Sequence, residues 1–249
     1  MITDIRAAVG FLTRIPVGSV EPTGLTRAAA YFPLVGAIVG GIGVGAWWIG
    51  ASLLGPPAGA VLGVLACVVV TGALHEDGLA DTADGLGGGS TRERRLAIMR
   101  DSRLGTYGAI AVGGDLLLRV ALLAPYGTGD WLDVTRILVA GHALGRAAPI
   151  ALAATLPPAR SDGQGSRLTA PGRIDLAIAV ALVVGVAIAT TAWWAPVPIA
   201  VGGLVVLAVR RAARRRIGGV TGDVHGAGVV LVNLAVAATV VALTDGGLV

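Results

Sequence analysis

The stretch AGAVLGVLACVVVTGALHEDGLADTADGLGGG, residues 58–89, joins two segments of opposite character. Residues 58–74 carry no charged side chain, whereas residues 75–89 hold a cluster of carboxylates. A helix needs about 20 mostly apolar residues to cross the hydrocarbon core of a bilayer. The stretch therefore predicts a membrane span that ends in an acidic segment.

The composition extends this interpretation to the whole chain. Hydrophobic residues make up 55% and charged residues 14% of the sequence, with a mean hydropathy of +0.81, whereas soluble domains carry about 25% charged residues. The apolar runs are continuous, which argues against the alternating pattern of a transmembrane barrel. They lie at 33–54, 58–74, 106–124, 134–156, 174–194 and 226–244, with a shorter run at 196–209. We predict an all-α fold, a polytopic integral membrane helical bundle of about seven transmembrane helices, formed by residues 1–249 as a single domain.

The 19 basic residues are all arginine, and their placement orients the predicted bundle. Connections with arginine alternate with connections that have none. Arginine precedes the first span and lies in the segments 75–105, 160–173 and 210–216; it is absent from 55–57, 125–133, 195–198 and the C-terminal tail. Under the positive-inside rule, the N-terminus and the acidic segment are cytoplasmic and the C-terminus is outside. The same placement attributes the pI of 10.2 to membrane orientation, so we expect no nucleic-acid partner.

The N-terminal segment MITDIRAAVGFLTRIP, residues 1–16, is not a secretory signal, because Arg6 and Arg14 interrupt any apolar core. Its apolar residues recur at helical spacing, which predicts a short interfacial helix.

Three carboxylates of the acidic segment have helical spacing. If the second span continues as a helix, Asp77, Asp81 and Asp84 lie at i, i+4 and i+7 on one face. Like charges at this spacing repel, whereas Mg²⁺ takes one or two protein carboxylates together with phosphate oxygens. We predict that this stripe binds Mg²⁺, with Gly78 and Gly85 giving a ligand access to the backbone. The alternative is a solvated loop with ordinary surface ion pairs.

Arginines follow the acidic stripe. GLGGG, 85–89, predicts a flexible loop, and Ser90 with Glu93 predicts a capping box for a helix over TRERRLAIMRDSR, 91–103. Arg100 and Arg103, at i and i+3, would then clamp a phosphate from one helix face. For the arginines of TRERR, ordinary loop charge is an equal alternative.

Charged residues also lie inside predicted spans, where each costs at least about 2.5 kcal/mol. Asp115 and Arg119 are i, i+4 and form either a structural pair or part of a site. Arg146, four residues after His142, is predicted to point toward the acidic segment. Asp223, in GGVTGDVHGAG, is predicted as a metal ligand or base, with a helix N-cap as the alternative.

Five stretches resemble, in order, the cobalamin synthase family of adenosylcobinamide-GDP ribazoletransferases. They are FLTRIP at 11–16, YFPLVGAIVG at 31–40, HEDGLADTADGLGGG at 75–89, RDSRLGTYG at 100–108 and TGDVHGA at 221–227. The resemblance implies a magnesium-dependent transferase of the bacterial cytoplasmic membrane, with its active site facing the cytoplasm. It joins adenosylcobinamide-GDP to α-ribazole, or its 5′-phosphate, giving adenosylcobalamin, or its phosphate, and GMP. His225 departs from the family pattern, where we expect a less polar residue.

The resemblance and the charge pattern together define the expected site. Expected catalytic residues are Asp77, Asp81, Asp84 and Asp223, of which the first three bind the metal. Expected substrate-binding residues are Glu76, Arg100, Asp101, Arg103, His142 and Arg146.

Two other functions fit parts of the sequence. A CDP-alcohol phosphotransferase has a similar acidic motif, but that family has an arginine after the alanine where this chain has Asp81. An ion-coupled transporter would use the charged residues inside the spans, whereas the densest charge here lies at the predicted cytoplasmic boundary. The expected partners of the protein are its substrates and the lipid bilayer, and the sequence leaves open whether it also forms a homo-oligomer.

Overall fold

The computed structural model describes residues 1–18, 24–163 and 168–245, and these form helices with short connections. Within them, the one β-type pairing is an isolated parallel bridge between Pro158 and Val220. The helices are α1 (Ile2–Leu12), α2 (Leu25–Ala29), α3 (Phe32–Leu54), α4 (Pro56–Thr71), α5 (Leu74–Gly88), α6 (Arg92–Ile98), α7 (Thr106–Leu123), α8 (Trp131–Gly145), α9 (Ala148–Ala153), α10 (Arg173–Thr191), α11 (Pro196–Ile217) and α12 (Gly222–Asp245), with 3-10 turns at Thr128–Asp130 and Ala192–Trp194. The predicted all-α class is confirmed.

Five of the described helices are long and apolar enough to cross a membrane: α3, α7, α10, α11 and α12. A sixth candidate is the pair α4 and α5, which bends by 88°. The polytopic membrane fold is confirmed, but the described residues give five or six candidate spans where about seven were expected. The predicted span 134–156 is divided into α8, of 15 residues, and α9, of 6. The weaker run 196–209 lies inside α11, a full candidate span.

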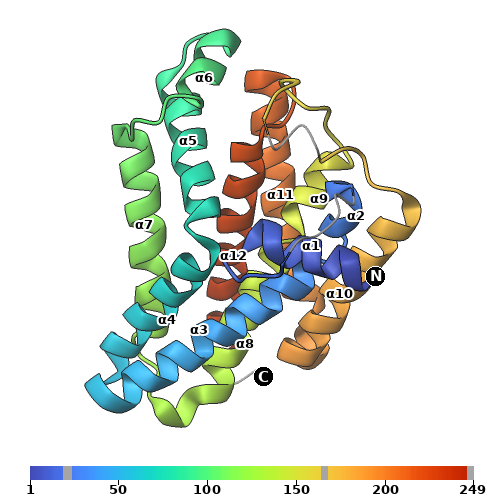
Figure 1. Cartoon of the computed structure of the whole chain (residues 1–249). Helices are drawn as coiled ribbons and strands as arrows, with labels where there is room; N and C mark the ends of the chain where they lie inside the picture. The colour runs from blue at the N-terminus through green and yellow to red at the C-terminus, as the bar shows by residue number, and fades with distance from the viewer. Residues whose placement is uncertain (19–23, 164–167, 246–249) are drawn as a thin grey trace.

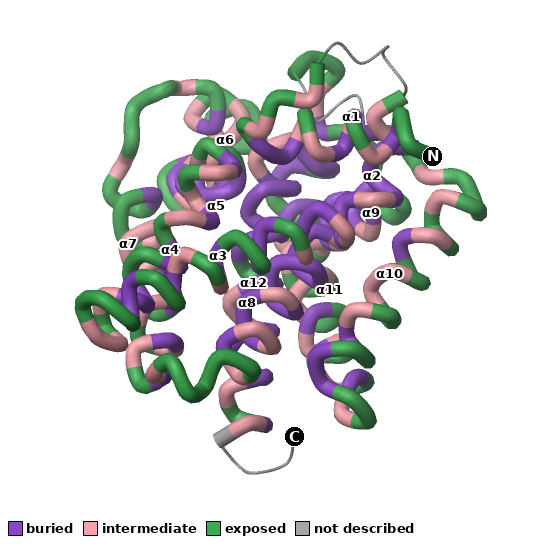
Figure 2. The backbone as a smooth tube through the Cα atoms, turned by 60° about the horizontal axis from the view of Figure 1, so that its bottom comes forward, coloured by how far each residue is buried: buried purple, intermediate pink, exposed green. Residues whose placement is uncertain are grey.

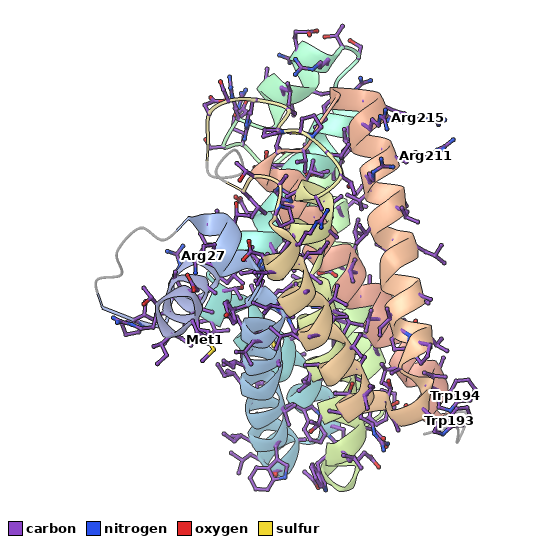
Figure 3. The ribbon with its side chains drawn as sticks, turned by 90° about the vertical axis from the view of Figure 1, so that its right-hand side faces the viewer. Met1, Arg27, Trp193, Trp194, Arg211 and Arg215 are labelled. Carbon is purple, nitrogen blue, oxygen red and sulfur yellow. The ribbon has the colours of Figure 1, made fainter. Side chains whose placement is uncertain are left out.

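The two ends of the bundle differ in charge. α6, the loop after α9 and the turn between α11 and α12 gather at one end, and the last turns of α12 lie toward the other (Figure 1). Arg211 and Arg215 lie at the first end, and Trp193 and Trp194 at the opposite one (Figure 3). α6 and the arginine-rich end of α11 therefore share one end, as the alternation in the sequence predicts, whereas Arg27 of the N-terminal segment lies nearer mid-height (Figure 3).

α12 lies at the centre of the bundle and packs against α8, α5 and α11. Buried residues concentrate there, while outer helices such as α10 are largely exposed (Figure 2). Large apolar side chains, among them Leu117, Ile188 and Leu204, are exposed on the outer helices. An apolar exterior of this extent suits a bundle whose solvent is lipid.

Glycines allow the inner helices to approach closely. A Cβ at Gly40 of α3 would lie 2.7 Å from the carbonyl oxygen of Leu138 in α8. Between α3 and α4, a Cβ at Gly63 would lie 2.9 Å from Cβ of Trp47. These distances leave no room for a side chain, so small residues determine which helices meet.

The predicted N-terminal helix is confirmed as α1. It packs through Ala8 and Leu12, both buried, against α2 and α3. The ring of Phe11 stacks parallel to that of Phe32, with centroids 5.8 Å apart. α1 is therefore part of the fold.

Candidate active site

The acidic helix α5 begins at a sharp break after α4. Gly72 and Ala73 have φ values of +64° and +56°, in the left-handed region, and their N–H groups donate to the carbonyl oxygens of Val69 and Val68 at the end of α4. Glycine adopts this conformation freely, whereas alanine does so at a cost. The expected continuous helix is wrong at this point, because the chain turns by 88° before the carboxylates begin.

Beyond the break, α5 is helical through Gly88. The predicted single face for the acidic stripe is confirmed, and the predicted flexible loop at 85–89 is wrong. A Cβ at Gly85 would lie 2.5 Å from the side chain of Met99, and one at Gly78 would lie 2.8 Å from the backbone oxygen of Asp223. Gly85 is therefore closed off by protein, and the access predicted there is wrong, whereas Gly78 packs against α12 and also lines a cavity described below.

The contact at Gly78 brings α12 against α5. Gly226 of α12 faces Gly78, since a Cβ at Gly226 would lie 3.3 Å from the Gly78 Cα. This approach places Asp223, in the first turn of α12, beside the first turns of α5. Asp77 is exposed and Asp81 half-buried, and Asp81 lies within electrostatic reach of both Asp77 and Asp223. Two helices far apart in sequence therefore form one carboxylate cluster.

Asp223 is held by two side chains. Its Oδ2 accepts hydrogen bonds from Nη2 of Arg160, at 3.2 Å, and from the hydroxyl of Thr221, at 3.1 Å. The backbone N–H of Val224 donates to the Thr221 hydroxyl. Thr221 thus caps the helix, which removes the capping alternative for Asp223.

Arg160 is the site residue that sequence reasoning missed. It lies after α9, where an isolated bridge ties the chain to the start of α12: Ala159 N–H donates to the Val220 carbonyl oxygen at 2.8 Å. Its Nη1 is buried and has no hydrogen-bond partner among the described residues. From the sequence, Arg160 was one of several charged residues in a connection between spans. Its place in the site depends on a bridge to residues distant along the chain, which the sequence does not reveal. An arginine beside carboxylates, with a free donor, is suited to bind a phosphate oxygen.

Asp84 has a different environment from the other two carboxylates of the stripe. It is buried, and its oxygens accept the backbone N–H groups of Gly105, at 2.8 Å, and Gly108, at 2.9 Å. The Asp84 carboxylate thereby satisfies donors at the start of α7 that have no partner within that helix. The metal role expected for Asp84 stays a prediction.

The segment with Arg100 and Arg103 is not helical, because α6 ends at Ile98. The predicted shared helix face is therefore wrong. Arg100 pairs with Asp162, at 2.6 Å, and Arg103 with Asp101, at 2.5 Å; all four are substantially exposed. The hydrogen bonds from Arg103 lower the pKa of Asp101 to about 2. Those from Arg100 lower the pKa of Asp162 below its ordinary value.

The arginines of α6 attach this helix to the end of α11. Arg92 donates to the carbonyl oxygens of Ile217 and Ala159, and Arg95 donates to that of Arg216. Unpaired carbonyls at a helix C-terminus are ready acceptors. The cap of α6 is Thr91, whose hydroxyl accepts from the Arg94 N–H, so the capping box predicted at Ser90 is wrong.

Glu76, His142 and Arg146 lie in the interior of the bundle. Arg119 binds Asp115, as predicted, and also Glu76, at 2.9 Å. Arg146 is 1% exposed and contacts Nδ1 of His142 at 2.9 Å. Glu76, His142 and Arg146 line a small internal cavity of about 10 Å³. Arg146 thus reaches the first turn of α5 from inside, away from Asp81. Substrate contacts by these three residues stay predictions.

A larger cavity, of about 230 Å³, opens beside the carboxylate cluster. Its polar edge is formed by His75, Asp77, Arg160, Asp223 and His225. Its apolar wall contains Phe11, Leu12, Leu25, Phe32, Leu74 and Leu168. A concave, mostly apolar site with a few convergent polar groups is typical of small-molecule binding.

The sequence model of the cobalamin-5-phosphate synthase family matches residues 4–241. The chain belongs to this family. It is 47% identical over 242 residues to an adenosylcobinamide-GDP ribazoletransferase of Azorhizobium caulinodans, covering 91% of this chain and 90% of the relative. A protein of the same name from Sinorhizobium medicae is 41% identical over 251 residues, covering 94% of each. No solved structure is significantly similar to the chain.

Four of the five stretches that resembled the cobalamin synthase family converge in this member on the larger cavity; RDSRLGTYG, 100–108, does not line it. FLTRIP supplies Phe11 and YFPLVGAIVG supplies Phe32. The acidic stretch supplies Asp77, and TGDVHGA supplies Asp223 and His225. Segments from both ends of the chain therefore build one site.

Proposed function

We propose that the chain is an adenosylcobinamide-GDP ribazoletransferase, which joins adenosylcobinamide-GDP to α-ribazole, or its 5′-phosphate, and releases GMP. Membership of the cobalamin-5-phosphate synthase family and the names of the relatives support this proposal. The observation that carries it is the meeting of Asp77, Asp223 and Arg160 at the edge of one cavity, with Asp81 within electrostatic reach of both carboxylates. Carboxylates next to an arginine with a free donor suit the transfer of a phosphate ester.

The reaction exchanges one oxygen–phosphorus bond for another. A secondary ribose hydroxyl of α-ribazole attacks the phosphorus on the cobinamide side of the pyrophosphate, because the 5′ oxygen is already esterified when the acceptor is the 5′-phosphate. The bond from that phosphorus to the bridging oxygen breaks, and GMP leaves with the bridging oxygen. Asp223, at the boundary between the cavity and the carboxylate cluster, takes the hydroxyl proton as general base.

Asp77 and Asp81 would hold Mg²⁺. No three His, Cys, Asp or Glu side chains gather closely enough among the described residues to hold a metal alone. Mg²⁺ needs fewer protein ligands, because one or two carboxylates suffice when phosphate oxygens and water complete its coordination. Two carboxylates on one face of α5, one exposed and one half-buried, fit this requirement. When bound, the ion supplies positive charge against the pyrophosphate.

Arg160 would bind a phosphate oxygen through its unpartnered Nη1 while its Nη2 holds Asp223. The guanidinium group presents several donors in one rigid plane. One side chain then fixes the base and the reacting phosphate relative to each other, which lowers the entropic part of the barrier.

The site would face the cytoplasm of a bacterial cell, in the cytoplasmic membrane. The supporting observation is that α6 and the arginine-rich end of α11 lie at the same end of the bundle (Figure 1). The positive-inside rule assigns such an end to the cytoplasm.

The test is product analysis with the full chain in liposomes. Adenosylcobinamide-GDP, α-ribazole and Mg²⁺ should yield GMP and adenosylcobalamin in equal amounts, and Asp81→Asn should yield neither. Glu93→Gln, an exposed acid-to-amide change on α6, should be as active as the unmodified chain. Release of CMP from CDP-diacylglycerol, without GMP formation, would instead identify a CDP-alcohol phosphotransferase.

A further inference from the structure

The cavity beside the carboxylate cluster has two unequal parts. Its wall is apolar and includes Phe11, whose ring stacks parallel to Phe32 with an interplanar angle of 4°. Its edge carries Asp77, Asp223 and Arg160. Such a site suits a ligand with a flat apolar body and one polar end.

One polar side chain within this cavity has no partner. His225 is 6% exposed, and neither of its ring nitrogens has a hydrogen-bond partner among the described residues. An unsatisfied buried polar group costs about 1–3 kcal/mol, and a neutral imidazole carries two such groups, a donor and an acceptor. Because His225 lines the cavity, a ligand or a water molecule bound there can supply the missing partner.

We propose that this cavity binds the acceptor nucleoside, with its benzimidazole ring against the apolar wall and its ribose at the acidic edge. His225 donates a ring N–H to the unglycosylated nitrogen of the base, the one polar atom within that ring that carries no substituent. The attacking ribose hydroxyl then lies beside Asp223. This assignment rests on the proposed function and specifies which substrate occupies the cavity.

The other candidate ligands, which are the two ends of the donor substrate and a lipid, fit this cavity less well. The corrin ring of the donor, with its amide arms, is far larger than a cavity of about 230 Å³. Its guanine base has several donors and acceptors, whereas the apolar wall offers none. A lipid acyl chain would fill the wall but has no polar atom for His225.

The first experiment fills the cavity with a larger side chain and measures the KM for each of the two substrates separately. Leu25, a partly exposed residue of the wall, is replaced by Trp. In liposomes, Leu25→Trp should raise the KM for α-ribazole about tenfold and leave the KM for adenosylcobinamide-GDP unchanged. The matched control is Leu204→Trp, on the lipid-exposed surface, which should change neither value.

The unchanged KM for adenosylcobinamide-GDP also serves as the folding control. A rise in that KM, with the α-ribazole value unaltered, would assign the cavity to the donor and overturn the inference. No change in either value, with a folded variant, would overturn it as well. If the unmodified chain forms no GMP from the two substrates, the proposed function fails, and the assignment of the cavity fails with it.

The second experiment tests His225 with an acceptor that lacks the ring nitrogen, the corresponding α-riboside of indole. The unmodified chain should prefer α-ribazole to this analogue by about tenfold in kcat/KM, because the analogue leaves His225 unsatisfied. His225→Ala should reduce this preference to about one, and His225→Gln, which retains a donor, should restore part of it. An undiminished preference in His225→Ala would show that His225 does not contact that nitrogen.

Discussion

The carboxylate of Asp84 accepts the backbone N–H of Gly108 at 2.9 Å, so a side chain of the acidic helix holds the first turn of α7. The same carboxylate accepts the Gly105 N–H at 2.8 Å. Asp84 therefore helps to fix the position of α7 relative to α5, together with the buried ion pair between Arg119 and Glu76.

Asp84→Ala should destabilise the protein, because it leaves the two N–H groups unsatisfied, at about 1–3 kcal/mol each. Asp84→Asn, which retains one acceptor oxygen, should lower the stability by a smaller amount. The measurement is Tm in detergent, together with the Mg²⁺ concentration needed for half-maximal turnover. A raised Mg²⁺ requirement at unchanged Tm would instead support the metal role predicted from the sequence.

Asp77→Asn and Asp81→Asn should abolish turnover without lowering Tm, because neither carboxylate is fully buried and their charges mainly repel each other. Mg²⁺ should protect the unmodified chain from thermal unfolding more than it protects either variant. Equal protection of all three proteins would place the metal elsewhere.

Arg160→Lys should lower kcat/KM at least about tenfold, or about 1.4 kcal/mol of transition-state stabilisation. Lysine preserves the charge but not the planar donors that reach both Asp223 and a phosphate. Arg103→Lys, at an 87% exposed side chain paired with Asp101, provides the comparison and should be fully active. If Arg103→Lys lost activity and Arg160→Lys did not, the phosphate would be bound by the segment with Arg100 and Arg103, as the sequence predicted.

Arg119→Gln should cost about 3–5 kcal/mol, because it leaves the carboxylates of Glu76 and Asp115 buried without a counter-charge. Arg136→Gln breaks a more accessible pair with Asp133 and should cost about 1 kcal/mol or less. Chemical unfolding in detergent measures both. Equal losses would mean that burial does not distinguish the two pairs.

The topology can be tested by cysteine labelling after Cys67, the single cysteine, is replaced by alanine. In intact cells, a membrane-impermeant reagent should label Asp130→Cys, while Ser90→Cys should react only after permeabilisation. The opposite pattern would invert the orientation that the arginines predict.

The sequence predicts those features that depend on neighbouring residues. Long apolar runs specify helices, and the spacing of Asp77 and Asp81 specifies a shared face, because both follow from helical geometry alone. The break at Ala73 was not predicted, since alanine gives no signal for a left-handed conformation. The approach of Arg160 to Asp223 depends on a backbone bridge between distant segments, which no local pattern encodes.

The contact between Gly78 and Gly226 has a consequence for the order of events during synthesis. α5 emerges from the ribosome long before α12, so the early helices insert while the partner of Gly78 is still missing. At that stage Asp77 and Asp81 are in place but Asp223 is missing. Under the proposed mechanism, no partly synthesised chain can carry out the transfer. Catalytic competence begins when the last helix enters the membrane and docks, so the nascent chain cannot act on its substrates while its own insertion is incomplete.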